Sequence, residues 1–146
     1  MIVRQATGAD HPLWAEMLAR LHDGDEAEFL AEIPAWLALR EPMICWLAFD
    51  GKGEPVGMVD ARVRNYAEGA PNLQAAYVED LWVEPEHRRG GVATALLAAV
   101  EQWAREQGLN WLGSDTELGN EVSCQWHEAA GFEEIERIVV FGKPLV

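Results

Sequence analysis

Basic residues are scarce in this chain of 146 residues. It holds 11 lysines and arginines against 25 aspartates and glutamates, which gives a formal net charge of −14 at pH 7 and a pI of about 4.5. Nucleic-acid-binding proteins need a basic face for phosphates, and proteins that dock on anionic membranes need basic clusters. The charge balance therefore argues against both classes. It favours a cationic partner or, as the simpler alternative, a solvated acidic surface.

Cysteine and long apolar runs are also scarce. Cys45 and Cys124 lie far apart, with no CxxC motif and no nearby pair of histidines. This pattern argues against a disulfide scaffold and a zinc site, so we expect no metal and two reduced, packed thiols, while a disulfide between the two stays open. No apolar run reaches the roughly 18–20 residues of a membrane span, and the N-terminus lacks a signal-peptide pattern. We therefore expect a cytoplasmic protein.

The apolar residues make up 49% of the chain and recur with clear helix and strand periods. In chain order, they predict a strand at 1–6, a helix at 11–21, a helix from 26 that contains Pro34, strands at 43–49, 56–63 and 75–83, a helix at 92–106, a strand at 109–113, a helix at 120–130 and a closing strand at 135–141. Early hairpins followed by βα units indicate one mixed α/β domain that spans residues 1–146.

The turn Arg88–Ala93 stands between a predicted strand and the strongest predicted helix. It contains the one adjacent pair of basic residues in the chain, followed by Gly90 and Gly91. The first N–H groups of a helix have no partner within the helix, and glycine lets a backbone approach a phosphate closely. The turn therefore predicts an anion site, with a plain glycine turn and solvated arginines as the alternative. GxxxxGK[ST] and GxGxxG motifs are absent, which argues against P-loop and Rossmann sites.

The six residues of this turn resemble the [QR]xxGx[GA] pyrophosphate loop of the GNAT-type N-acetyltransferases. The order of predicted elements agrees over the whole chain, and Gly131-Phe132 matches the family's "GF" pair. The resemblance implies the GNAT fold, a mixed, mostly antiparallel sheet flanked by helices, with acetyl-CoA as cosubstrate. It implies cofactor contacts from Leu81, Trp82, Val83, Arg88, Arg89, Gly90, Gly91, Val92, Ala93, Thr94 and Asn120.

Several short segments resemble one branch, the aminoglycoside 6'-N-acetyltransferases. They are residues 2–5, Trp14, 78–83, 114–116, 126–132 and 133–137. This resemblance implies transfer of acetyl to the 6'-amine of an aminoglycoside by direct attack in a ternary complex, and hence antibiotic resistance. It also implies a homodimer, since the family often dimerises through its C-terminal strand region.

Acetyl transfer needs a neutral amine, a polarised thioester carbonyl and a protonated leaving thiolate. The resemblance implies Glu79 as the base, and backbone N–H groups near Val83 as the polarising donors. If strand pairing is regular, Asp80 faces the opposite side from Glu79. His127 stands where many relatives carry a tyrosine, so it is a candidate general acid, with a packed helix histidine as the alternative.

On the acceptor side, the resemblance implies an acidic cleft for ammonium groups, formed by Glu79, Asp115 and Glu136, with Tyr66 packed on a sugar ring. His22 and Asp80 depart from the branch, which tends to carry an aromatic and a small residue at those positions. The sequence leaves two alternatives open. One is acetylation of another cation, such as a polyamine or a protein amine, and the other is a CoA-binding module without catalysis.

Overall fold

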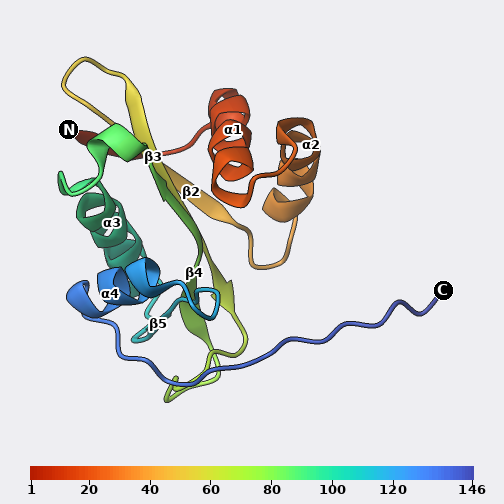
Figure 1. The fold of residues 1–146 in the computed structure, drawn as a ribbon. Helices are drawn as coiled ribbons and strands as arrows, with labels where there is room; N and C mark the ends of the chain where they lie inside the picture. The colour runs from red at the N-terminus through yellow and green to blue at the C-terminus, as the bar shows by residue number, and fades with distance from the viewer. The chain divides into compact units, whose positions relative to one another are not determined.

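The computed structural model describes residues 1–146 (Figure 1). It divides into two units, residues 1–115 and residues 116–146, which are described separately. The first unit is built on a five-stranded sheet in the order β1-β2-β3-β4-β5, formed by β1 Ile2–Gln5, β2 Ile44–Phe49, β3 Pro55–Arg64, β4 Ala75–Val83 and β5 Leu112–Gly113. Neighbouring strands from β1 to β4 are antiparallel, and β5 is parallel to β4. The predicted mixed, mostly antiparallel sheet is confirmed.

The helices cover both faces of this sheet. They are α1 His11–His22, α2 Glu26–Leu37 and α3 Val92–Glu106, with short 3-10 turns at Gly8–Asp10 and Pro85–His87. Figure 1 shows α1 and α2 on one side of the sheet and α3 on the other. Pro34 lies inside α2 without ending it. No helix combines the length and the apolar character needed to cross a membrane.

Alternation along β3 explains the two layers. Met58 is fully buried in a cluster with Trp14 and Leu18 of α1, so the side chains in phase with Met58 face α1 and α2. We call this side the α1/α2 face. On the opposite side, Gly57 lets α3 approach, because a Cβ at this position would lie 3.1 Å from Cγ1 of Val92.

A β-bulge interrupts the pairing of β3 with β4. Asp60 pairs with Asp80 and Ala61 pairs with Val78, so Glu79 is the extra residue. Asp60 and Arg64 lie on the same face of β3, and Glu79 contacts Arg64 while Asp80 pairs with Asp60. The side chains of Glu79 and Asp80 therefore both lie on the α1/α2 face. The expectation that Asp80 faces the opposite side is wrong, because it assumed regular alternation.

The second unit contains α4 Glu121–Ala129 and no strand. The closing strand predicted at 135–141 is wrong, since residues 132–146 form neither helix nor strand. A strand needs a neighbour for its N–H and C=O groups, and this segment pairs with none. Its apolar side chains are exposed, with Val140 at 83% and Phe141 at 89%. The strand predicted at 109–113 is also shorter than expected, at Leu112–Gly113.

Candidate active site

The loop before α3 has the backbone of an anion site. Arg89 and Gly91 have left-handed φ angles of 63° and 87°, and no side chain caps the first turn of α3. The N–H groups of Val92, Ala93 and Thr94 in that turn are thus unpaired within the helix. A Cβ at Gly90 would lie 3.2 Å from the carbonyl oxygen of His87, which favours glycine there. Backbone donors, the helix dipole and flanking arginines fit a pyrophosphate.

Arg88 turns back onto the end of β4. Its Nε donates to the carbonyl oxygen of Val83 at 3.0 Å, and its guanidinium lies 4.8 Å from the ring of Trp82. Arg20 of α1 covers the same indole at 5.3 Å and pairs with Glu84. Trp82 therefore lies close to two guanidinium groups, and its indole Nε1 is buried without a partner. The strand that ends in Leu81–Val83 is followed by the 3-10 turn Pro85–His87 and then by the anion-binding turn.

Glu79 is held by Arg64 on the α1/α2 face. Arg64 Nε lies 3.0 and 3.2 Å from the two carboxylate oxygens of Glu79, and its Nη2 also reaches both. The same guanidinium lies 3.6 Å from the ring of Tyr77, whose hydroxyl donates to Oδ2 of Asp115 at 2.9 Å. Burial and this hydrogen bond raise the pKa of Tyr77, so its hydroxyl stays a donor. The structure thus brings together two predicted acceptor-site acids, Glu79 and Asp115.

Gly113 makes the room that Tyr77 needs. A Cβ at Gly113 would lie 2.7 Å from the ring of Tyr77, which is closer than carbon atoms pack. Because β5 runs parallel to β4 and pairs Gly113 with Tyr77, the carboxylate of Asp115 arrives beside the hydroxyl. The lack of a side chain at Gly113 therefore lets the end of β5 pack against Tyr77.

A second chain of contacts starts at Asp80. Its Oδ1 lies 2.6 Å from Nε2 of His22, the last residue of α1. Across the sheet Asp80 pairs with Asp60, which is fully buried and accepts a 2.8 Å hydrogen bond from Nε1 of Trp14. Burial raises the pKa of the Asp60 carboxyl well above its usual range, and the nearby charge of Asp80 adds to this. The buried Asp60 therefore holds a proton more tightly than an exposed aspartic acid does.

Comparison with known proteins decides the family. The family model described as the Acetyltransferase (GNAT) family matches residues 11–132. The chain belongs to the GNAT acetyltransferase family. The predicted resemblance to this family is confirmed. The assignment of the anion-binding turn as the acetyl-CoA loop stays a prediction.

The chain is similar to named aminoglycoside acetyltransferases within the GNAT family. The chain is 38% identical to an aminoglycoside N(6')-acetyltransferase type 1 of Stenotrophomonas maltophilia, over 98% of the chain and 93% of that relative. A protein of the same name from Klebsiella aerogenes is 36% identical, over 99% of the chain and 97% of that relative.

Solved structures agree. The apo aminoglycoside 6'-N-acetyltransferase AAC(6')-IG of Acinetobacter haemolyticus has a TM-score of 0.90 at 31% identity, and each chain is covered fully. AAC(6')-Iy in complex with the bisubstrate analogue CoA-S-monomethyl-acetylneamine has a TM-score of 0.89 at 30% identity, covering 98% of this chain and 97% of that one. The likeness to the branch predicted from the short segments is confirmed.

The remaining GNAT site predictions fall partly in the second unit. Asn120 caps α4, where its side-chain oxygen accepts from the N–H of Ser123 at 3.1 Å. His127 Nδ1 lies 2.7 Å from the carbonyl oxygen of Ser123, and the rings of Trp126 and Phe132 flank the imidazole. Both residues thus have structural contacts within this unit, and their roles toward acetyl-CoA stay predictions.

Two predicted acceptor residues have no anchoring contact in the structure. Tyr66, in the β3–β4 connection, is 64% exposed. Glu136 lies exposed in the segment that follows α4. Their contacts with an acceptor stay predictions, and both side chains are available to a ligand from solvent.

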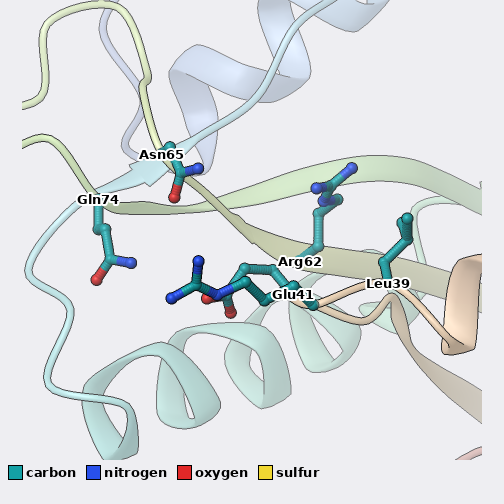
Figure 2. A pocket seen from close by; sticks show the side chains of 6 residues that line it. Leu39, Glu41, Arg62, Asn65 and Gln74 are labelled. Atoms are coloured by element: carbon teal, nitrogen blue, oxygen red, sulfur yellow. The ribbon is translucent and has the colours of Figure 1, made fainter.

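A polar pocket of about 260 Å³ lies near Arg64 (Figure 2). It is lined by Leu39, Arg40, Glu41, Arg62, Asn65 and Gln74. Figure 2 shows Leu39 and Glu41 on the α2–β2 connection, Arg62 on β3, and Asn65 and Gln74 at the two ends of the β3–β4 connection. Two guanidinium groups against one carboxylate do not suit a cation. The GNAT acceptor site is therefore better assigned to the acids around Glu79 than to this pocket.

Three residues that contact or pair with the predicted acids were not predicted from the sequence: Asp60, Arg64 and Tyr77. Alternation along β3 does place Asp60 and Arg64 on one face, which is the signal that could have found them. His22 and Asp80 were each noted as departures from the branch. Their contact joins residues far apart in the sequence, so no local pattern reveals it. No three His, Cys, Asp or Glu side chains gather as a metal site, and both cysteines are free.

Proposed function

We propose that this GNAT chain is an aminoglycoside 6'-N-acetyltransferase. It transfers acetyl from acetyl-CoA to the 6'-amine by direct attack in a ternary complex, and so confers resistance. The proposal rests on β4, which bears Glu79 at its bulge and is followed, after one 3-10 turn, by the anion-binding turn before α3. A cation-binding carboxylate and an acyl-donor site are thereby joined by one short strand. The relatives named above, which bear this activity in their names over nearly the whole chain, support it.

The acyl donor occupies the loop and the strand before it. Backbone N–H groups from about Arg89 to Thr94 hold the pyrophosphate, because they are unpaired and lie at the positive end of the α3 dipole. The pantetheine arm runs along Leu81–Val83, and backbone N–H near Val83 polarises the thioester carbonyl. Acetyl-CoA supplies the acetyl group as a thioester, and Asn120 contacts its arm.

The acceptor occupies the α1/α2 face at the bulge. Glu79 is the catalytic carboxylate that contacts the reacting ammonium, and Asp115 and Glu136 hold further ammonium groups. Tyr66 packs on a sugar ring, and His127 protonates the leaving thiolate. Since Arg64 occupies both oxygens of Glu79, a proton reaches this carboxylate only if one of those contacts breaks.

The protein acts as a cytoplasmic homodimer in this proposal. Residues 132–146 carry apolar side chains that are largely exposed, among them Ile138, Val139 and Val140. An extended apolar segment without a strand partner is suited to pair with a second copy of the chain. The partner copy then supplies the neighbour that the predicted closing strand lacks.

A thiol-release assay tests the proposed activity. Acetyl-CoA is offered with kanamycin-type and gentamicin-type aminoglycosides, with polyamines and with protein amines. Release of CoASH with aminoglycosides is expected. Release with polyamines or protein amines alone would move the function to that class, and acetyl-CoA binding without turnover would indicate a CoA-binding module.

A further inference from the structure

The two carboxylates at the bulge of β4 have opposite partners. Glu79 is neutralised by the guanidinium of Arg64, which reaches both of its oxygens. Asp80 contacts an imidazole instead, with Nε2 of His22 at 2.6 Å from its Oδ1. An imidazole accepts protons near neutral pH, whereas a carboxylate that already accepts from two guanidinium nitrogens is a weaker proton acceptor. The group beside Asp80 is therefore better suited to take a proton than Glu79.

The contact with Asp80 sets which nitrogen of His22 is free. A carboxylate accepts hydrogen bonds, so the ring must carry its proton on Nε2 to donate to Asp80. The second nitrogen, Nδ1, then has a lone pair and no protein partner. The His22 side chain is 47% exposed, against 14% for Asp80, so this nitrogen is open to a ligand. The ring of Phe29 packs on the imidazole at 5.8 Å and limits its rotation.

Asp60 is buried beside Asp80 and holds the Asp80 side chain in place. One oxygen of Asp60 accepts from the indole of Trp14, and the other, Oδ1, is buried and receives no donor. A proton on that oxygen turns Asp60 into a donor toward its strand partner Asp80. This contact orients the side chain of Asp80 toward His22. A fully buried carboxyl in this position is costly unless it is used in such a contact.

The charged groups around the pair come from several elements. Asp60 faces it from β3, Glu79 with Arg64 stands beside it at the bulge, and Asp23 follows His22 at the end of α1. Cys45 of β2 lies in the core below, and burial raises the pKa of its thiol, so it stays neutral. Apart from Arg64, which Glu79 occupies, and Arg20, which Glu84 occupies, these neighbours are acids or neutral groups. The surroundings of the His22–Asp80 pair therefore suit a cationic acceptor.

We propose that His22, positioned by Asp80 and Asp60, is the catalytic base of acetyl transfer. The inference rests on the proposed function. Nδ1 of His22 takes a proton from the acceptor ammonium, and the electron pair of the broken N–H bond stays on the amine nitrogen. The amine attacks the thioester carbon, the C–S bond breaks, and its electron pair leaves with sulfur. The acylated nitrogen loses its second proton as the thiolate gains one, and the imidazolium returns its proton to solvent.

Steady-state kinetics against pH test the role of His22. His22→Phe keeps a ring against Phe29 but removes the base. We expect kcat to fall about 100-fold at neutral pH, with KM for the acceptor and Kd for acetyl-CoA changed less than about twofold. The limb of the kcat profile that reports the base should disappear. Wild-type kcat with an unchanged profile, or a change confined to KM, would overturn the proposal.

Asp80→Asn tests the positioning residue, with Asp23→Asn as the matched control. Both variants remove one carboxylate next to His22, but Asp23 does not contact the imidazole and stands in a left-handed conformation that asparagine tolerates. Asp80→Asn should lower kcat about tenfold and shift its pH profile, and Asp23→Asn should leave both unchanged. Equal behaviour of the two variants would contradict a specific role of Asp80.

The tautomer of His22 can be read without any substrate. Nitrogen NMR of the wild-type protein should show the neutral ring protonated on Nε2, and Asp80→Asn should reduce that preference. A neutral ring protonated on Nδ1 would overturn the inference. If the wild-type enzyme acetylates no aminoglycoside, the proposed function fails. The NMR spectrum still tests which nitrogen of His22 carries the proton. If it acetylates aminoglycosides and His22→Phe changes nothing, the inference alone fails.

Discussion

The guanidinium of Arg64 grips both carboxylate oxygens of Glu79 and stacks on Tyr77. Glu79 is the extra residue of a β-bulge, so without this contact its side chain would have no fixed direction. The pair ties the bulge to the end of β3. Through Tyr77 it also reaches Asp115 at the end of β5. The guanidinium of Arg64 thereby connects Glu79 and Asp115, the two acids that are proposed to bind the acceptor.

Removing either member of this pair should damage turnover and spare the cofactor. Glu79→Ala should lower kcat at neutral pH by tens of fold or more, because the acceptor amine loses its carboxylate. Arg64→Lys should also lower kcat/KM for the acceptor, since lysine lacks the planar fork. Kd for acetyl-CoA, measured by calorimetry, should stay within about twofold. Arg105→Gln on the exposed side of α3 is the control, and equal losses there would contradict a specific role of Arg64.

The cofactor loop should not tolerate a negative side chain at Gly91. Its φ of 87° strains any side chain, and a carboxylate would stand where the pyrophosphate binds. Gly91→Asp should abolish acetyl-CoA binding in calorimetry. Gly51→Asp adds the same charge in a turn with open space around its Cα, so its affinity should match the wild type. Retained affinity in Gly91→Asp would refute the assignment of this loop.

The buried carboxyl of Asp60 should make stability depend on pH. Because the folded protein raises the pKa of Asp60 above its unfolded value, the folded state holds the proton more tightly. The free energy of unfolding should therefore fall as pH rises from about 4, the unfolded pKa, toward the folded pKa. Asp60→Asn keeps the acceptor for Trp14 and an N–H donor toward Asp80 but has no proton to lose.

Urea unfolding of the wild type and of Asp60→Asn across pH tests the direction of this change in the free energy of unfolding. The stability of Asp60→Asn relative to the wild type should rise with pH above about 4 and level off beyond the folded pKa. A difference that is constant with pH would mean that Asp60 does not titrate between the two states. A difference that falls with pH would mean that Asp60 is ionised in the fold.

The exposed C-terminal segment should mediate dimerisation. Val140→Asp puts a charge into an apolar run that is proposed to pair with a second copy, so the monomer should increase by tenfold or more at a given protein concentration. Sedimentation velocity measures this directly. Lys52→Asp in the exposed β2–β3 turn is the control for an added acid. A wild-type protein that sediments as a monomer at every concentration would contradict the dimer.

Local pattern predicted most of the fold. The bounds of α3 and β4 follow from strong periodicity that ends at glycines and a proline, and the tight turn before α3 follows from its glycines. The bulge at Glu79 could not be predicted, because the register of β3 and β4 depends on packing between distant segments. The same holds for the contact of His22 with Asp80. The prediction of a closing strand at 135–141 was wrong because β-propensity is a local property, whereas a strand forms only with a pairing partner.

Product analysis with a matched pair of acceptors tests whether the enzyme acetylates the 6'-amine of an aminoglycoside. One is an aminoglycoside with an amine at the 6' position, and the other is its analogue with a hydroxyl there. The account predicts CoASH release and one acetyl group on the 6' nitrogen, located by NMR, for the first, and no release for the second. Equal release with both acceptors, or acetyl on another nitrogen, would contradict it.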